Sequence, residues 1–267
     1  MTDTTASELT EGAPPVVVVH PSAELLAHGG ASRLLLTLID AQSVASPVHI
    51  ALTGGSIVVS LLEQVAQNPL AAAVDWSAVH VWWGDERFVP EGHEERNERD
   101  ARAALLARVP LPATNIHTMP GPDRAPDVQT AAADYTRELA EHAPAGATVP
   151  EFAALVLGMG PDGHVASLFP GRPSLDVTEV GAIAEPDSPK PPPERVSLTL
   201  AALSSARQVW LVVSGESKAP AVAAALTGSG LVDEDGTEGP KVPAGMVRGR
   251  LRTLWLLDLP AATALPA

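Results

Sequence analysis

The chain has 267 residues, of which 45% are hydrophobic and 3% aromatic, so it can form one large domain with a core built mainly from Ala, Val and Leu. The absence of cysteine excludes disulfides, thiolate metal sites and a cysteine nucleophile. The formal net charge of −15 argues against nucleic acid and anionic membranes as partners, and an anionic substrate would need a local cluster of cations.

The first residues, 1–13, are polar and acidic, and we expect them to form a disordered tail. They lack the basic region typical of a secretory signal, and no apolar run in the sequence reaches the length of a membrane span. We therefore expect a cytoplasmic protein with one α/β domain over residues 14–260 and a C-terminal tail over 261–267. The sequence does not distinguish a monomer from a small homo-oligomer.

The first predicted elements after this tail are a strand and a helix. The β-branched run at 16–19 predicts a buried strand. An apolar pattern of mainly helical period predicts a helix over 22–43, which Gly29 and Gly30 weaken in the middle.

A second strand, predicted over 47–52, runs into Gly54, Gly55 and Ser56 before a helix over 57–67. The glycines allow the backbone to approach a ligand, and Ser56 can cap the helix. The helix N-terminus supplies unpaired N–H groups and a partial positive charge. This arrangement is typical of an anion site, although a plain strand-to-helix turn explains it equally well.

A third strand, predicted over 79–83, ends in Asp85, Glu86 and Arg87. Three charges at the end of an apolar strand suggest that Arg87 binds an anionic oxygen, with Asp85 or Glu86 orienting it. The alternative is an exposed turn with a local ion pair. Asn97 follows near the start of a helix predicted to run to residue 106.

A helix over 127–141 and a strand over 152–157 lead into the glycine-rich turn that contains Asp162 and His164. Asp162 can hold the imidazole in one tautomer, which leaves the other ring nitrogen for proton transfer. Ligands of open α/β sheets bind at the carboxyl ends of strands, where this turn lies. The alternative is a tight turn with an exposed histidine.

The four prolines between 187 and 194 exclude a central strand and predict an ordered edge or a flap. Arg195, which begins a strand predicted over 195–200, is a candidate anion ligand or an exposed basic side chain. A strand over 208–213 precedes Lys218, at the start of a helix over 219–226. A cation there opposes the helix dipole, which favours a role in neutralising a bound anion.

The remaining elements are predicted as a polar loop over 228–239 and strands over 243–247 and 254–258. The eight histidines are scattered, without the short spacings typical of metal ligands, so no metal site is predicted. His117 is best explained as a surface or packing residue. Strands alternate with helices along almost the whole chain, which predicts an α/β fold with a mostly parallel sheet and helices on both faces.

Residues 158–164 (GMGPDGH) and 167–171 (SLFPG) together resemble the signature of the 6-phosphogluconolactonases and of the related glucosamine-6-phosphate isomerases. Four further segments resemble these families in the same order, at 53–56, 85–97, 195–199 and 214–218. The resemblance implies a Rossmann-like fold and hydrolysis of 6-phospho-D-glucono-1,5-lactone in the oxidative pentose phosphate pathway, with no metal or organic cofactor.

The resemblance also implies roles for the candidate residues. His164 would take a proton from the attacking water, and Asp162 would orient the imidazole. The phosphate of the substrate would be bound by Gly54, Gly55, Ser56 and Lys218, together with Arg87 or Arg195.

Two alternative functions follow from the same motifs. A glucosamine-6-phosphate isomerase, or deaminase, needs a glutamate that works with the histidine, and Phe169 occupies that position here. A catalytically silent sugar-phosphate sensor would usually carry a DNA-binding domain, for which the chain has no spare segment.

Overall fold

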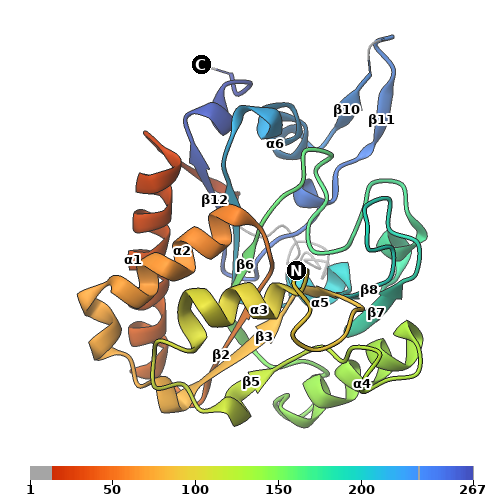
Figure 1. Ribbon diagram of the computed structural model, residues 1–267. Coiled ribbons are helices and arrows are strands. Elements are labelled where there is room, and N and C mark those ends of the chain that lie inside the picture. The colour runs from red at the N-terminus through yellow and green to blue at the C-terminus, as the bar shows by residue number, and fades with distance from the viewer. Residues whose placement is uncertain (1–13, 234, 267) are drawn as a thin grey trace, which may run out of the picture.

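The computed structural model describes residues 14–233 and 235–266, so the predicted tail at 1–13 lies outside the described residues. Seven strands form one parallel sheet in the order β1-β12-β9-β6-β2-β3-β5 (Figure 1). These strands are β1 (Val16–His20), β2 (Val48–Leu52), β3 (Val79–Trp83), β5 (Ile116–His117), β6 (Phe152–Leu157), β9 (Gln208–Val213) and β12 (Arg252–Asp258). The central strands β2 and β6 are buried at every residue, as expected for apolar strands covered on both faces.

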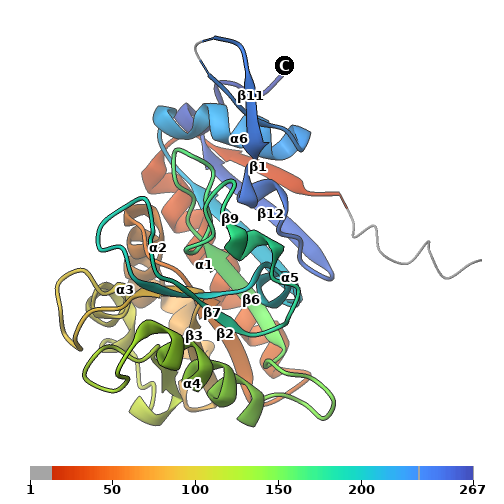
Figure 2. The ribbon, with the colours of Figure 1, turned by 90° about the vertical axis from the view of Figure 1, so that its right-hand side faces the viewer.

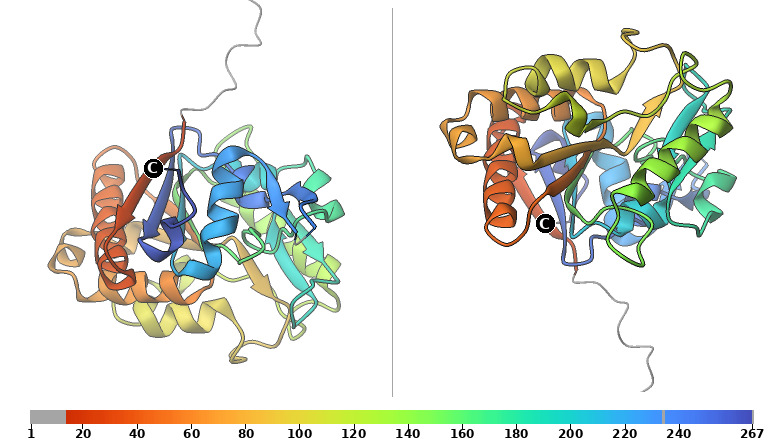
Figure 3. Two further views of the ribbon diagram at one scale, coloured as in Figure 1. Left: turned by 90° about the horizontal axis from the view of Figure 1, so that it is seen from above. Right: turned by 90° about the horizontal axis from the view of Figure 1, so that it is seen from below.

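The helices lie on both faces of this sheet, which confirms the predicted fold class. Viewed from above, β1 and β12 lie between α1 and α6 (Figure 3). The helices are α1 (Ala23–Gln42), α2 (Ser56–Gln67), α3 (Asn97–Ala101), α4 (Val128–Glu141), α5 (Leu200–Ser204) and α6 (Ala219–Thr227). α3 continues as a π-helical turn over Arg102–Leu106.

The glycine pair in α1 does not interrupt the helix. A Cβ added at Gly30 would lie 2.5 Å from Cδ1 of Leu61 in α2, so the missing side chain lets the two helices pack closely. The cost of glycine in a helix is offset here by packing.

A second, antiparallel sheet has the order β4-β8-β7, with β4 (Asp85–Arg87), β7 (Ala182–Glu185) and β8 (Arg195–Leu198). Helix α4 packs against β7 (Figure 2). On its other side, the hydroxyl of Tyr135 in α4 accepts a hydrogen bond from the backbone N–H of Trp83, at 2.9 Å, and lies 3.3 Å from the carbonyl oxygen of His117. This buried hydroxyl therefore joins α4 to the ends of β3 and β5.

Two sequence-based assignments near the C-terminus are wrong. The polar loop predicted over 228–239 contains most of a hairpin of β10 (Gly230–Val232) and β11 (Glu238–Lys241). The strand predicted over 243–247 is a short 3₁₀-helix, Pro243–Gly245, because Pro243 has no N–H for a sheet ladder and Gly245 lies against the backbone of Ala225. Of the predicted C-terminal tail, Ala261 is buried.

The carboxyl ends of neighbouring strands are tied together where the chain leaves the sheet. The backbone N–H of Thr53, after β2, donates to the carbonyl of Val156 in β6, at 3.1 Å. In return, the Thr53 hydroxyl accepts from the N–H of Gly158, at 2.9 Å. Beside them, Gly84 donates to the carbonyl of Leu52, at 2.7 Å. These bonds fix three of the loops that were predicted to carry functional groups, those after β2, β3 and β6. Among the helices in the described part of the chain, none has the length and apolar character needed to cross a bilayer.

Candidate functional site

A cavity of about 350 Å³ lies at the carboxyl ends of β2, β6 and β9. It brings together most of the residues that the sequence singled out, from five separate segments. The predicted residues in its lining are Gly54, Gly55, Ser56, Asp85, Arg87, Asn97, His164, Arg195 and Lys218. Asp162 and Glu86 are not in the lining: Asp162 contacts His164, and Glu86 is buried in the protein.

One end of the cavity is formed by the N-terminus of α2. Gly55 is the N-cap and Ser56 is the first helical residue, so the predicted capping role of Ser56 is not found. Within the described part of the chain, no side chain caps this helix, which leaves its first N–H groups available to a ligand. The missing side chain of Gly54 leaves room for Asn97 beside this helix start, because a Cβ at Gly54 would lie only 1.9 Å from Oδ1 of Asn97.

Lys218 also lines the cavity, at the N-cap of α6. Its loop is held by the buried carboxylate of Asp258, which accepts from the Ser214 hydroxyl, at 2.6 Å, and from the Gly215 N–H, at 3.0 Å. Partial burial and the nearby charge of Lys190 lower the pKa of Lys218, while Asp162 opposes this shift. Two helix N-termini and a lysine thus make this part of the cavity electropositive.

Arg87 is oriented by Asn97, because its Nη1 donates to the Asn97 side-chain oxygen. The Asn97 amide donates in turn to the backbone carbonyl of Asp85, at 2.9 Å. The Glu86 carboxylate does not contact the guanidinium of Arg87; it accepts the backbone N–H groups of Arg87, Asn97 and Glu98 at 2.8–2.9 Å. Burial raises the pKa of Glu86 to about 7, against the ion pair with Arg96 and these three N–H groups. Glu86 therefore stabilises the backbone of the loop, and Asn97 orients the Arg87 guanidinium.

Arg195 holds the proline-rich flap in place. Its Nε and Nη2 donate, at 3.1 Å, to the backbone carbonyls of Pro192, Lys190 and Pro191. The side chain is buried, and burial lowers its pKa although Asp85 and Glu86 oppose this. Much of its hydrogen-bonding capacity is thus used inside the protein, whereas Arg87 contributes its charge beside the α2 N-terminus.

His164 lies at the other side of the cavity, and its Nδ1 is 2.5 Å from Oδ1 of Asp162. A carboxylate can only accept, so Nδ1 carries the hydrogen and Nε2 has a free lone pair. Partial burial alone would raise the pKa of Asp162, but the hydrogen bond with His164 and the charges of His164 and Lys190 lower it well below its usual range. Asp162 therefore stays ionised and holds the imidazole in the tautomer suited to a general base.

Sequence reasoning missed Lys190, whose Nζ lies 3.2 Å from both Asp162 Oδ1 and His164 Nδ1. The feature of the sequence that could have indicated Lys190 is its position as the one cation inside the proline-rich stretch before Arg195. Ser167 was also missed as a functional residue, and its hydroxyl donates to Asp85 Oδ2 at 2.7 Å.

The sequence predicts no metal site, because its histidines are scattered, but the fold brings three of them close together. His80, His117 and His142 have ring nitrogens that all lie within 4.8 Å of one another. His117 is also a packing residue, as predicted, since its ring stacks on Trp82 with centroids 3.8 Å apart. None of the three lines the 350 Å³ cavity.

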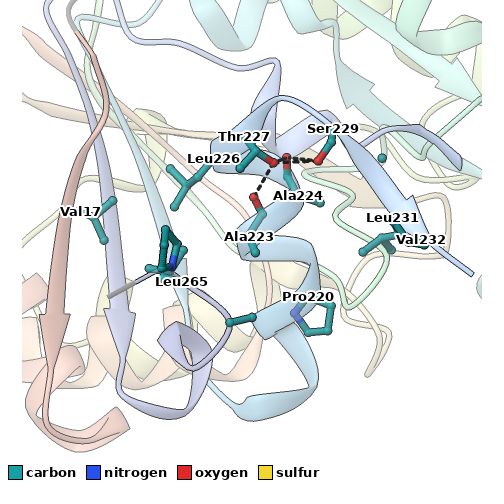
Figure 4. A pocket seen from close by; sticks show the side chains of 13 residues that line it. Val17, Pro220, Ala223, Ala224, Leu226, Thr227, Ser229, Leu231, Val232 and Leu265 are labelled. Atoms are coloured by element: carbon teal, nitrogen blue, oxygen red, sulfur yellow. Dashed lines mark hydrogen bonds between the residues drawn. The ribbon is translucent and has the colours of Figure 1, made fainter. Parts of the chain in front are cut away.

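A larger pocket, of about 620 Å³, lies between β1, α6 and β10 (Figure 4). Its walls are mainly apolar, as at Val17, Leu226 and Leu265, and the hydroxyls of Thr227 and Ser229 hydrogen-bond to each other at 2.7 Å. Among the described residues that line it, none has a charged side chain, so it lacks the means to bind an anion.

The chain as a whole is similar to proteins of an enzyme family. Residues 21–255 match the family model described as glucosamine-6-phosphate isomerases/6-phosphogluconolactonase. The chain is 48% identical to the 6-phosphogluconolactonase of Streptomyces coelicolor, with 94% of this chain and 95% of that protein aligned. It is 41% identical to the 6-phosphogluconolactonase of Mycobacterium tuberculosis, over 94% and 98% of the two chains. The solved structure of the 6-phosphogluconolactonase from Trypanosoma brucei matches with a TM-score of 0.75 and 26% identity, over 94% of this chain and 99% of that one.

Proposed function

Since the chain belongs to the glucosamine-6-phosphate isomerase/6-phosphogluconolactonase family, we propose that it hydrolyses 6-phospho-D-glucono-1,5-lactone to 6-phospho-D-gluconate in the oxidative pentose phosphate pathway. The observation that carries the proposal is one cavity with a cationic end, at Lys218 and Arg87, and an Asp162–His164 pair at another side. A phosphorylated substrate with a reactive carbonyl needs both.

The cationic end binds the phosphate of the substrate. The free N–H groups at the start of α2 donate to phosphate oxygens, and the ammonium of Lys218 supplies positive charge. Arg87, which Asn97 orients, adds the positive charge of its guanidinium. This local cluster overcomes the repulsion from a protein of net charge −15. Anchoring the phosphate fixes the lactone carbonyl near His164.

His164 then works as a general base and afterwards as a general acid. Its Nε2 takes a proton from water as the water oxygen attacks the lactone carbonyl carbon. When the tetrahedral intermediate collapses, the bond between that carbon and the ring oxygen breaks. The imidazolium returns the proton to the ring oxygen, and the new carboxylic acid ionises. Asp162 stabilises the transient imidazolium, and Lys190 keeps Asp162 in position.

The residue beside His164 argues against the isomerase alternative. Phe169 is 1% exposed, and its ring centroid lies 4.6 Å from that of His164. An aromatic ring cannot relay the proton that ring opening of an amino sugar requires. The apolar ring instead packs against the catalytic imidazole.

The test is to incubate the purified chain with freshly generated 6-phosphogluconolactone and to follow acid release, with glucosamine 6-phosphate as the competing substrate. We expect lactone hydrolysis and no detectable ammonia or fructose 6-phosphate. His164→Ala should lose most of the activity while circular dichroism shows a folded protein. Near wild-type turnover in that variant would remove His164 as the base, and ammonia release at a rate comparable to lactone hydrolysis would assign the chain to the isomerases.

A further inference from the structure

Three imidazoles from separate elements converge on the sheet face covered by α4, away from the lactone cavity. His80 comes from β3, His117 ends β5, and His142 is the C-cap of α4 (Figure 1). The Nδ1 of His80 lies 2.8 Å from the Nε2 of His117. The ring centroid of His142 is 4.5 Å from that of His117 and 5.8 Å from that of His80. Each residue thus offers a nitrogen toward the same small region.

One residue, Glu138, orients two of these rings. Its carboxylate Oε1 lies 2.8 Å from the Nδ1 of His117, and its backbone carbonyl lies 3.0 Å from the Nδ1 of His142. Both oxygens only accept, so each Nδ1 carries its hydrogen and each Nε2 presents a lone pair. A histidine that donates one N–H to a carboxylate or carbonyl and uses the other nitrogen as a ligand is the usual arrangement around protein-bound metals.

Packing alone does not account for this convergence. The stacking of Trp82 explains why His117 is buried, and the Trp82 indole N–H donates to the neighbouring His49, at 3.0 Å. Neither contact requires His80 and His142 to meet at His117.

We propose that His80, His117 and His142 form a binding site for a divalent late transition metal ion of the Zn²⁺ type, with Glu138 as the residue that positions two of the ligands. Imidazole nitrogens suit such ions, and three of them leave a fourth tetrahedral position for water. The metal would join the C-terminal end of α4 to β3 and β5. The site is separate from the lactone cavity, and its role is to stabilise the fold.

Binding requires the rings to rearrange, because the three nitrogens, now within 4.8 Å of one another, must reach the spacing of a tetrahedral site. With metal–nitrogen distances of about 2.0–2.1 Å, two ligands of a tetrahedral ion lie roughly 3.3 Å apart. The His80 and His117 nitrogens, now 2.8 Å apart, must therefore separate slightly to admit the ion. His80 donates from Nδ1 in the present contact, so on binding that hydrogen leaves Nδ1 and either moves to Nε2 or is released to solvent.

The test uses the full chain, purified without a polyhistidine tag and treated with a chelator that is then removed. We expect isothermal titration with ZnCl₂ to show one site per chain, and Zn²⁺ to raise the thermal unfolding temperature. His142→Ala should weaken Zn²⁺ binding at least tenfold and abolish the thermal shift. His93→Ala is the matched control, because His93 is a half-exposed histidine on another loop, and it should change neither.

Two further measurements separate coordination from adventitious binding. Glu138→Gln should weaken Zn²⁺ binding by roughly 10–100-fold without abolishing it, as expected for a residue that orients ligands. Co²⁺ should give the intense visible absorption of a tetrahedral site in the wild-type chain and not in His142→Ala. Equal Zn²⁺ affinity in the wild type, His142→Ala and Glu138→Gln, or no saturable binding at all, would overturn the proposal.

Discussion

Replacing Gly54 by alanine tests how the cationic end of the cavity is built. The new Cβ would lie 1.9 Å from Asn97 Oδ1, whereas ordinary contact begins at 3.4 Å, so the amide must move by about 1.5 Å (3.4 − 1.9). That movement separates Asn97 from the Arg87 guanidinium and from the carbonyl of Asp85. A misplacement of this size in a catalytic site costs on the order of a hundredfold. Overpacking should cost about 1–3 kcal/mol of stability.

The assay is kcat/KM for lactone hydrolysis, combined with urea unfolding. We expect Gly54→Ala to lose about a hundredfold in kcat/KM while remaining folded. The double variant Gly54→Ala/Asn97→Ala should be no worse than Asn97→Ala alone, because the group that the methyl displaces is then absent. Activity within threefold of wild type in Gly54→Ala, or losses that multiply in the double variant, would refute the reasoning.

Three other predictions concern separate parts of the molecule. Lys218→Ala should mainly raise KM for the phosphorylated lactone, because losing one charged contact costs about 1.5–3 kcal/mol of binding free energy. The substitution should matter far less for unphosphorylated gluconolactone. Equal losses on both substrates would place Lys218 outside the phosphate site. Phe169→Glu should lower lactonase activity, because it puts a second negative charge beside His164, and ammonia release from glucosamine 6-phosphate by this variant would count against our account of the site. Asp127→Ala should lower the midpoint of urea unfolding without changing kcat, since Asp127 Oδ1 accepts the Thr130 N–H at the start of α4, at 2.7 Å. An unchanged midpoint would contradict the capping role.

Much of the fold follows from local patterns. The apolar runs of β2, β6 and β9 are continuous because both faces of the sheet are covered, and each ends in a loop rich in glycine or charge. That pattern places His164, Lys218 and the glycines near 54 at one edge of the sheet before any coordinates are known.

The parts that could not be predicted depend on how distant segments meet. Lys190 reaches His164 because Arg195 bonds to the carbonyls of the flap, and no local pattern encodes that contact. The three histidines converge because β3 and β5 are neighbours in the sheet and α4 ends above them. Sequence separations of 37 residues between His80 and His117, and of 25 between His117 and His142, hide this proximity.

The Tyr135 hydroxyl has a practical consequence. It is the only phenol in the sequence, and burial raises its pKa well above the usual value although the Trp83 N–H opposes this. A solvent-exposed tyrosine ionises near pH 10. The ultraviolet absorbance of tyrosinate is therefore a built-in optical reporter, which does not appear near pH 10 while α4 remains packed on the ends of β3 and β5. In an alkaline titration it marks the opening of this region without an introduced label.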